Sequence, residues 1–108
     1  MSSATPRAPG HLSRESKTWW KQVVNDYELA PHHLKLLQAA CEAWDSLVAA
    51  RLALAEGGTT MKDRFGTERA RPQVKMELDS RQAFWTILRH LDLEGESLPL
   101  TPHGARAR

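Results

Sequence analysis

The sequence predicts a mainly α-helical chain with three helices and one short β-hairpin or loop. Three observations carry this prediction. Apolar residues recur at gaps of three and four over most of the chain, which is the period of one helix face. Prolines suited to the first position of a helix stand at Pro31 and Pro72, and Gly57 and Gly58 are suited to ending one. Strand character appears between these glycines and Pro72.

The longest predicted helix spans residues 31–56, and the other elements are arranged around it. Good helix formers dominate this segment, and no Gly or Pro interrupts it. One apolar face is expected to contain Leu34, Leu37, Cys41, Trp44, Val48, Leu52 and Ala55. At a rise of about 1.5 Å per residue the helix is roughly 39 Å long. We interpret so long a helix in a chain of 108 residues as an assembly element.

A shorter helix is predicted on each side of the long one. The first, about 14–28, follows the good N-cap residue Ser13 and has Glu15 in its first turn. Its apolar side is expected to contain Trp19, Trp20, Val23, Val24 and Tyr27. The third helix, about 72–92, carries Val74, Leu78, Phe84, Trp85, Leu88 and Leu91. Because the connection before Pro31 is short, we expect the first helix to pack on the second.

The remaining segments are predicted to be a hairpin and two tails. Residues 59–70 form a short β-hairpin or loop with Gly66 near its middle. Residues 1–12 and 96–108 are rich in Pro, Ser, Ala and Arg, which indicates flexible tails, the second of them basic. One helical domain, residues 13–95, remains. A core of that size is modest, so self-association is a natural supplement.

Charge is unevenly distributed along the chain, although the net charge is only +2. Cations outnumber carboxylates in residues 1–21 and again in residues 59–75. The candidate residues for binding a polyanion are Arg14, Lys17 and Lys21 in the first helix, and Lys62, Arg64, Arg69 and Arg71 in the hairpin region. The first three recur at intervals of three and four, so they share one helix face. A solvated charged surface is the alternative interpretation.

No motif indicates catalysis, a metal site or a cofactor. Neither GxxxxGK[ST] nor GxGxxG is present, and the five histidines and single cysteine form no ligand pattern. We expect Cys41 to be a small buried residue rather than a nucleophile, and the four tryptophans to fill the core rather than stack on bases. One cysteine and no long apolar run predict an intracellular protein without a membrane segment.

The order of these features resembles the small terminase subunits of tailed double-stranded DNA phages, the P27-type, HK97-like family. The resemblance begins with PGHLSRESKTWWKQVV and continues with the second helix, LAPHHLKLLQAACEAWDSLVAA. AEGGTTMKD is similar to the family's turn into a hairpin, and ARPQVKMELDSRQAFWTILRHLDLEGES to its third helix. LPLTPHGARAR is similar to the closing Leu-x-Pro and basic tail. The resemblance to this family covers roughly residues 9–106. The chain departs from the family at Ala30, where Ser or Thr is expected before the proline.

This resemblance implies a non-catalytic subunit that recognises viral DNA and forms a homo-oligomeric ring in the host cytoplasm. The implied partners are double-stranded viral DNA, copies of the same chain, and a large terminase subunit that carries the ATPase and nuclease. Residues 13–95 would then serve oligomerisation and DNA binding. With the long helix as a pillar of the ring, Trp44 and Val48 are expected at the contact with a neighbour.

Two other functions remain open at this point. Helices one and two could form a helix-turn-helix regulator, although the start of the second helix offers only His32, His33 and Lys35 for base recognition. A structural helical adaptor without DNA affinity is the second alternative.

Overall fold

The computed structural model describes residues 5–93 and 98–99. In chain order the elements are α1 (Arg14–Asp26), β1 (Tyr27–Glu28), α2 (Pro31–Gly57), β2 (Thr60–Lys62), β3 (Glu68–Ala70), α3 (Pro72–Leu91) and β4 (Leu98–Pro99). The predicted mainly helical fold, with three helices and a hairpin, is confirmed for these residues. The first helix ends two residues earlier than predicted, because Tyr27 and Glu28 are extended and pair with β4.

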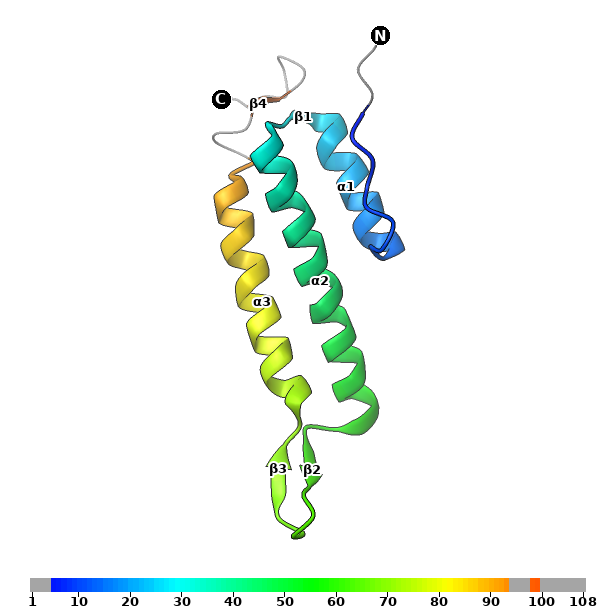
Figure 1. Cartoon of the computed structure of the whole chain (residues 1–108), viewed down its shortest axis with the longest axis vertical. Coiled ribbons are helices and arrows are strands. Elements are labelled where there is room, and N and C mark those ends of the chain that lie inside the picture. Colours follow the sequence, from blue (N-terminus) through cyan, green and yellow to red (C-terminus); the bar gives the residue numbers. More distant parts are fainter. Residues whose placement is uncertain (1–4, 94–97, 100–108) are drawn as a thin grey trace.

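The molecule is elongated, with extents of 62 × 28 × 20 Å. Helices α2 and α3 run antiparallel along the long axis, and α1 lies beside the first half of α2 (Figure 1). The hairpin β2–β3 projects from the end where α2 leads into α3 (Figure 1). Its strands are antiparallel, with Met61 opposite Arg69 and Lys62 opposite Glu68. The hairpin and α1 are therefore at opposite ends of the chain's long axis.

The core lies at the end of the molecule that holds α1. Its buried residues are Leu12, Trp20, Val23 and Val24 around α1, Leu37, Ala40 and Cys41 on α2, and Leu91 at the end of α3. Leu47 and Ala50 extend the buried face of α2. None of residues 51–90 is buried. The hairpin half of the molecule is thus two helices and a hairpin without fully buried side chains.

The predicted apolar face of α2 is correct in its first half and wrong in its second half. Leu37 and Cys41 are buried, but Val48 is 40% exposed and Leu52 is 59% exposed. Leu47 and Ala50 are buried instead. Helix α1 covers only the first half of α2, so beyond it the buried face of α2 is the one that contacts α3 (Figure 1).

Residues 5–12, which the sequence assigned to a flexible tail, pack along α1. The indole Nε1 of Trp20 donates a hydrogen bond to the Pro6 carbonyl at 3.0 Å. Leu12 is buried in the core. The packed region therefore begins before Ser13. Residues 1–4 lie outside the described residues, and so does most of the predicted C-terminal tail, including Arg106 and Arg108. Within that tail, Leu98–Pro99 is described and pairs with β1.

A carboxylate on α2 holds the start of α1. Asp45 accepts hydrogen bonds from the Ser13 backbone N–H at 2.8 Å, the Ser13 hydroxyl at 2.6 Å and the Ser16 hydroxyl at 2.7 Å. The Ser13 hydroxyl in turn accepts from the Ser16 N–H, which makes Ser13 the N-cap of α1 as the sequence predicted. One side chain thus joins the cap of α1 to the middle of α2.

These hydrogen bonds make the stability of the fold depend on the ionisation of Asp45. Desolvation by burial acts to raise the pKa of Asp45, but the bonds from Ser13 and Ser16 outweigh it and hold that pKa below the ordinary 3.8. A carboxyl group whose pKa is lowered by folding stabilises the fold at pH values above its ordinary pKa. That contribution is lost as the pH falls through the folded-state pKa.

We predict that Asp45→Asn lowers the free energy of unfolding by about 1–3 kcal/mol near neutral pH, because an amide cannot replace all three accepted hydrogen bonds. The difference from the native chain should shrink below pH 3.8. Urea unfolding at neutral pH and at about pH 3 measures both effects. Asp26→Asn, at an exposed position, is the matched control and should change stability by less than about 0.5 kcal/mol. A native-like stability for Asp45→Asn would contradict the role of this carboxylate.

Candidate nucleic-acid interface and aromatic groove

The three predicted cations of α1 form one basic surface. Arg14, Lys17 and Lys21, together with Thr18, line a shallow pocket of about 420 Å³. Arg14 and Lys21 are exposed and Lys17 is half-buried. None of the three cations belongs to an ion pair within the described residues. Cations beside a hydroxyl on one helix face are the groups that contact backbone phosphates.

The cations of the hairpin region are in a different situation. Arg69 donates to the Asp63 carboxylate at 3.0 Å. This bond, together with those from the amides of Thr67 and Phe65, lowers the pKa of Asp63. The Arg64 guanidinium lies 5.1 Å from the centre of the Phe65 ring. Lys62 is exposed on β2, opposite Glu68. The surface charge of the hairpin is therefore partly balanced by its own carboxylates.

Arg71 closes the C-terminal end of α2. Its Nη1 donates to the carbonyl of Ala53 at 2.9 Å and to that of Gly58 at 2.8 Å. A cation is favourable at this position, because the C-terminal end of a helix carries a partial negative charge. Gly57 leaves room for the guanidinium, since a Cβ at this position would collide with it. Local charge grouped Arg71 with the polyanion-binding candidates, but its guanidinium bonds to the chain itself.

The two groups of predicted basic residues do not meet in one chain. The α1 group lies beside the first half of α2, whereas the hairpin group lies beyond its other end (Figure 1). A single copy therefore presents two separate basic surfaces. The sequence predicted both groups from local charge, but local charge carries no information on how far apart they lie.

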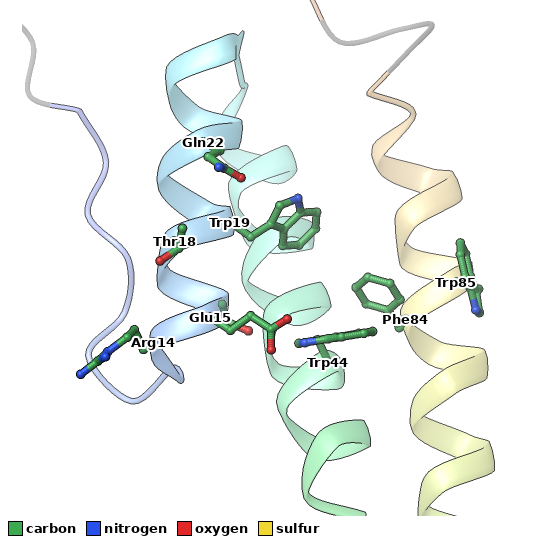
Figure 2. Close-up of a pocket in the computed structure, with 9 residues that line it drawn as sticks. Arg14, Glu15, Thr18, Trp19, Gln22, Trp44, Phe84 and Trp85 are labelled. Carbon is green, nitrogen blue, oxygen red and sulfur yellow. The ribbon is translucent and has the colours of Figure 1, made fainter. Parts of the chain in front are cut away.

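An aromatic groove opens between α1 and α3, over α2. Its volume is about 750 Å³, and it is lined by Arg14, Glu15, Ser16, Thr18, Trp19, Gln22, Trp44, Phe84 and Trp85. The Phe84 ring is central: its centre lies 6.1 Å from that of Trp19, 5.2 Å from Trp44 and 5.8 Å from Trp85. Figure 2 shows Glu15 turned toward Trp44, whereas Arg14 points away from the groove.

This groove was missed by the sequence prediction that the four tryptophans fill the core. Only Trp20 among them is buried, and Trp85 is 57% exposed. The two residues predicted at the contact with a neighbouring subunit differ in burial. Trp44 is half-buried against Phe84 of its own chain, whereas Val48 is exposed. A signal was present in the adjacent aromatic pairs Trp19-Trp20 and Phe84-Trp85. Neighbours on a helix point about 100° apart, so both members of a pair rarely enter one core.

Cys41 is the buried free thiol of the described residues. Burial, aided by the charges of Asp45 and Glu42, raises the pKa of the Cys41 thiol to about 12, so the thiol stays protonated at neutral pH. Cys41 is a fully buried free cysteine, as predicted. No group of three His, Cys, Asp or Glu side chains in the described part of the chain is placed to hold a metal ion. Among the helices of that part, none is long and apolar enough to cross a membrane.

Comparisons with known proteins returned no match to any family model, curated protein or solved structure. The terminase resemblance therefore rests on the five sequence segments that suggested it.

We predict that Arg71→Gln destabilises the chain by about 1–3 kcal/mol, because the substitution removes a charged donor from two carbonyls at the end of α2. Lys62→Gln removes one positive charge from the neighbouring strand β2, where Lys62 is exposed, and should change stability by less than about 0.5 kcal/mol. Thermal and urea unfolding of the two variants provides the comparison. Equal stabilities would show that Arg71 has no structural role at the end of α2.

Proposed function

We propose that this chain is the small terminase subunit of a tailed double-stranded DNA phage, a non-catalytic subunit that binds viral DNA and regulates a large ATPase-nuclease subunit. The observation that carries this proposal is the α1 basic surface, where Arg14, Lys17 and Lys21 stand together without ion pairs in the described chain. Free cations on one face favour a phosphate backbone over a small acidic ligand.

The uncovered apolar surface supports assembly into an oligomer. On α2 and α3 the exposed apolar residues include Val48, Leu52, Leu78 and Trp85, and Trp85 also lines the aromatic groove. Large exposed apolar surfaces typically mark protein contacts. A homo-oligomeric ring repeats the α1 basic surface once per subunit, so a net charge of +2 per chain becomes a large basic surface.

The helix-turn-helix alternative fits the arrangement of helices less well. The two helices of that motif cross at roughly 90–120°, whereas α1 lies antiparallel to α2 (Figure 1). Helix α2 is also flanked by α1 and α3 over its first half, which leaves its start poorly placed to enter a major groove (Figure 1). A structural adaptor without DNA affinity is the second alternative, and it leaves the α1 basic surface without a ligand.

We predict that Lys17→Glu combined with Lys21→Glu weakens binding of double-stranded DNA by at least about tenfold at roughly 50 mM salt. The slope of the logarithm of the binding constant against the logarithm of the salt concentration should also become shallower, by about 0.9 for each phosphate that the protein no longer neutralises. Mobility shifts over a salt series measure both quantities. Lys35→Glu with Lys75→Glu is the control, since it makes the same charge change at exposed positions on α2 and α3. Equal DNA binding by the two double variants would contradict the α1 surface.

We predict that the native chain forms a discrete oligomer of ring size, because its exposed apolar surface has no cover within the described chain. Light scattering or native mass spectrometry over a concentration series measures the subunit number. A monomer at every concentration would contradict the proposed assembly.

A further inference from the structure

The tip of the hairpin is a rigid turn that presents one aromatic side chain to solvent. Asp63 organises it: its Oδ1 accepts from the N–H groups of Phe65 and Thr67, its carbonyl accepts from Gly66 N–H, and its Oδ2 accepts from Arg69. Gly66 takes the positive φ of 81° that the turn requires. Phe65 is 77% exposed, the most exposed of the large apolar residues described. The Arg64 guanidinium lies over its ring.

The aromatic groove has the complementary chemistry. Trp19, Trp44, Phe84 and Trp85 supply ring faces and edges for another aromatic ring, and rings of this kind also attract cations. Glu15 is turned toward these rings (Figure 2) and has no ion-pair partner among the described residues. The groove therefore suits an aromatic side chain accompanied by a cation, which is what Phe65 and Arg64 present.

The tip cannot reach the groove of its own chain. Trp44 lies thirteen residues before the end of α2 at Gly57, so about 20 Å of helix separates the groove from the base of the hairpin. The hairpin extends away from that end (Figure 1). A contact between tip and groove must therefore join two copies of the chain.

We propose that the hairpin tip of one copy docks into the aromatic groove of another, with Phe65 on the Trp19, Phe84 and Trp85 rings and Arg64 against Glu15. The turn is already ordered, so docking costs little conformational entropy. Tip and groove are different surfaces, so each copy uses both of them, as in a head-to-tail contact. This contact goes beyond the proposed DNA-packaging role and does not depend on it.

The first test uses variants that each lack one half of the contact. Phe65→Ser removes the tip and Trp85→Ser removes part of the groove; both positions are exposed, so both variants are expected to fold. Each variant alone should associate at least about tenfold more weakly than the native chain in sedimentation or native mass measurements. An equal mixture should recover 1:1 pairs, since one intact tip then meets one intact groove. Met76→Ser is the control, because Met76 is an exposed apolar residue on α3 outside the groove.

The second test exchanges the charges. Arg64→Glu and Glu15→Arg should each weaken association, and the double variant should restore it, a recovery that a loss of folding cannot produce. The proposal is overturned if the four single variants of tip and groove keep the native mass, or if the mixture of Phe65→Ser and Trp85→Ser does not recover pairs. It is also overturned if Met76→Ser weakens association as much as they do. A monomeric native chain also overturns it. If Phe65→Ser keeps the native mass but loses DNA binding, the tip contacts DNA and the proposal is wrong. The DNA-binding role is judged separately, by charge reversal on α1.

Discussion

The carboxylate of Asp45 determines where α1 sits. It accepts three hydrogen bonds from Ser13 and Ser16, and Ser13 is also the N-cap that begins α1. His11 adds a contact of 2.7 Å to Glu42 one turn earlier on α2. The start of α1 is thus attached to the middle of α2 by hydrogen bonds to a carboxylate, which are shorter and stronger than hydrogen bonds between neutral groups. The groove wall and the α1 basic surface both lie on the helix that these bonds position.

Most helix boundaries were predictable because they depend on local chemistry. Pro31 and Pro72 begin α2 and α3 as expected, and Gly58 ends α2 with a positive φ of 80°. The buried face in the second half of α2 was not predictable in this way. Periodicity shows that a helix has an apolar face, but the choice between Leu47 and Val48 depends on which neighbour covers that turn. The pairing of β1 with β4 joins segments about seventy residues apart and has no local signal.

The candidate surfaces were predictable to a similar degree. Spacing alone placed Arg14, Lys17 and Lys21 on one face, because the helix period converts sequence intervals directly into geometry. Local charge was a poorer guide for Arg71, whose hydrogen bonds go to carbonyls near the end of α2 and just beyond it. The aromatic groove needed the packing of three helices before it could be recognised. Residue types that repeat along one helix are visible in a sequence, whereas sites shared between elements are not.

The position of the core divides the molecule into two parts that differ in local stability. Past Ala50 on α2, and before Leu91 on α3, no residue is buried, so the hairpin half is held by partial side-chain contacts and by the Arg51–Glu77–Arg81 ion cluster. Such regions open at a fraction of the global unfolding free energy. Amide protons of β2 and β3 are therefore expected to exchange through local opening, faster than those beside the buried residues Leu37 and Cys41 on α2. An evolving chain could change the length or sequence of the hairpin end without disturbing the packing around Leu37 and Cys41.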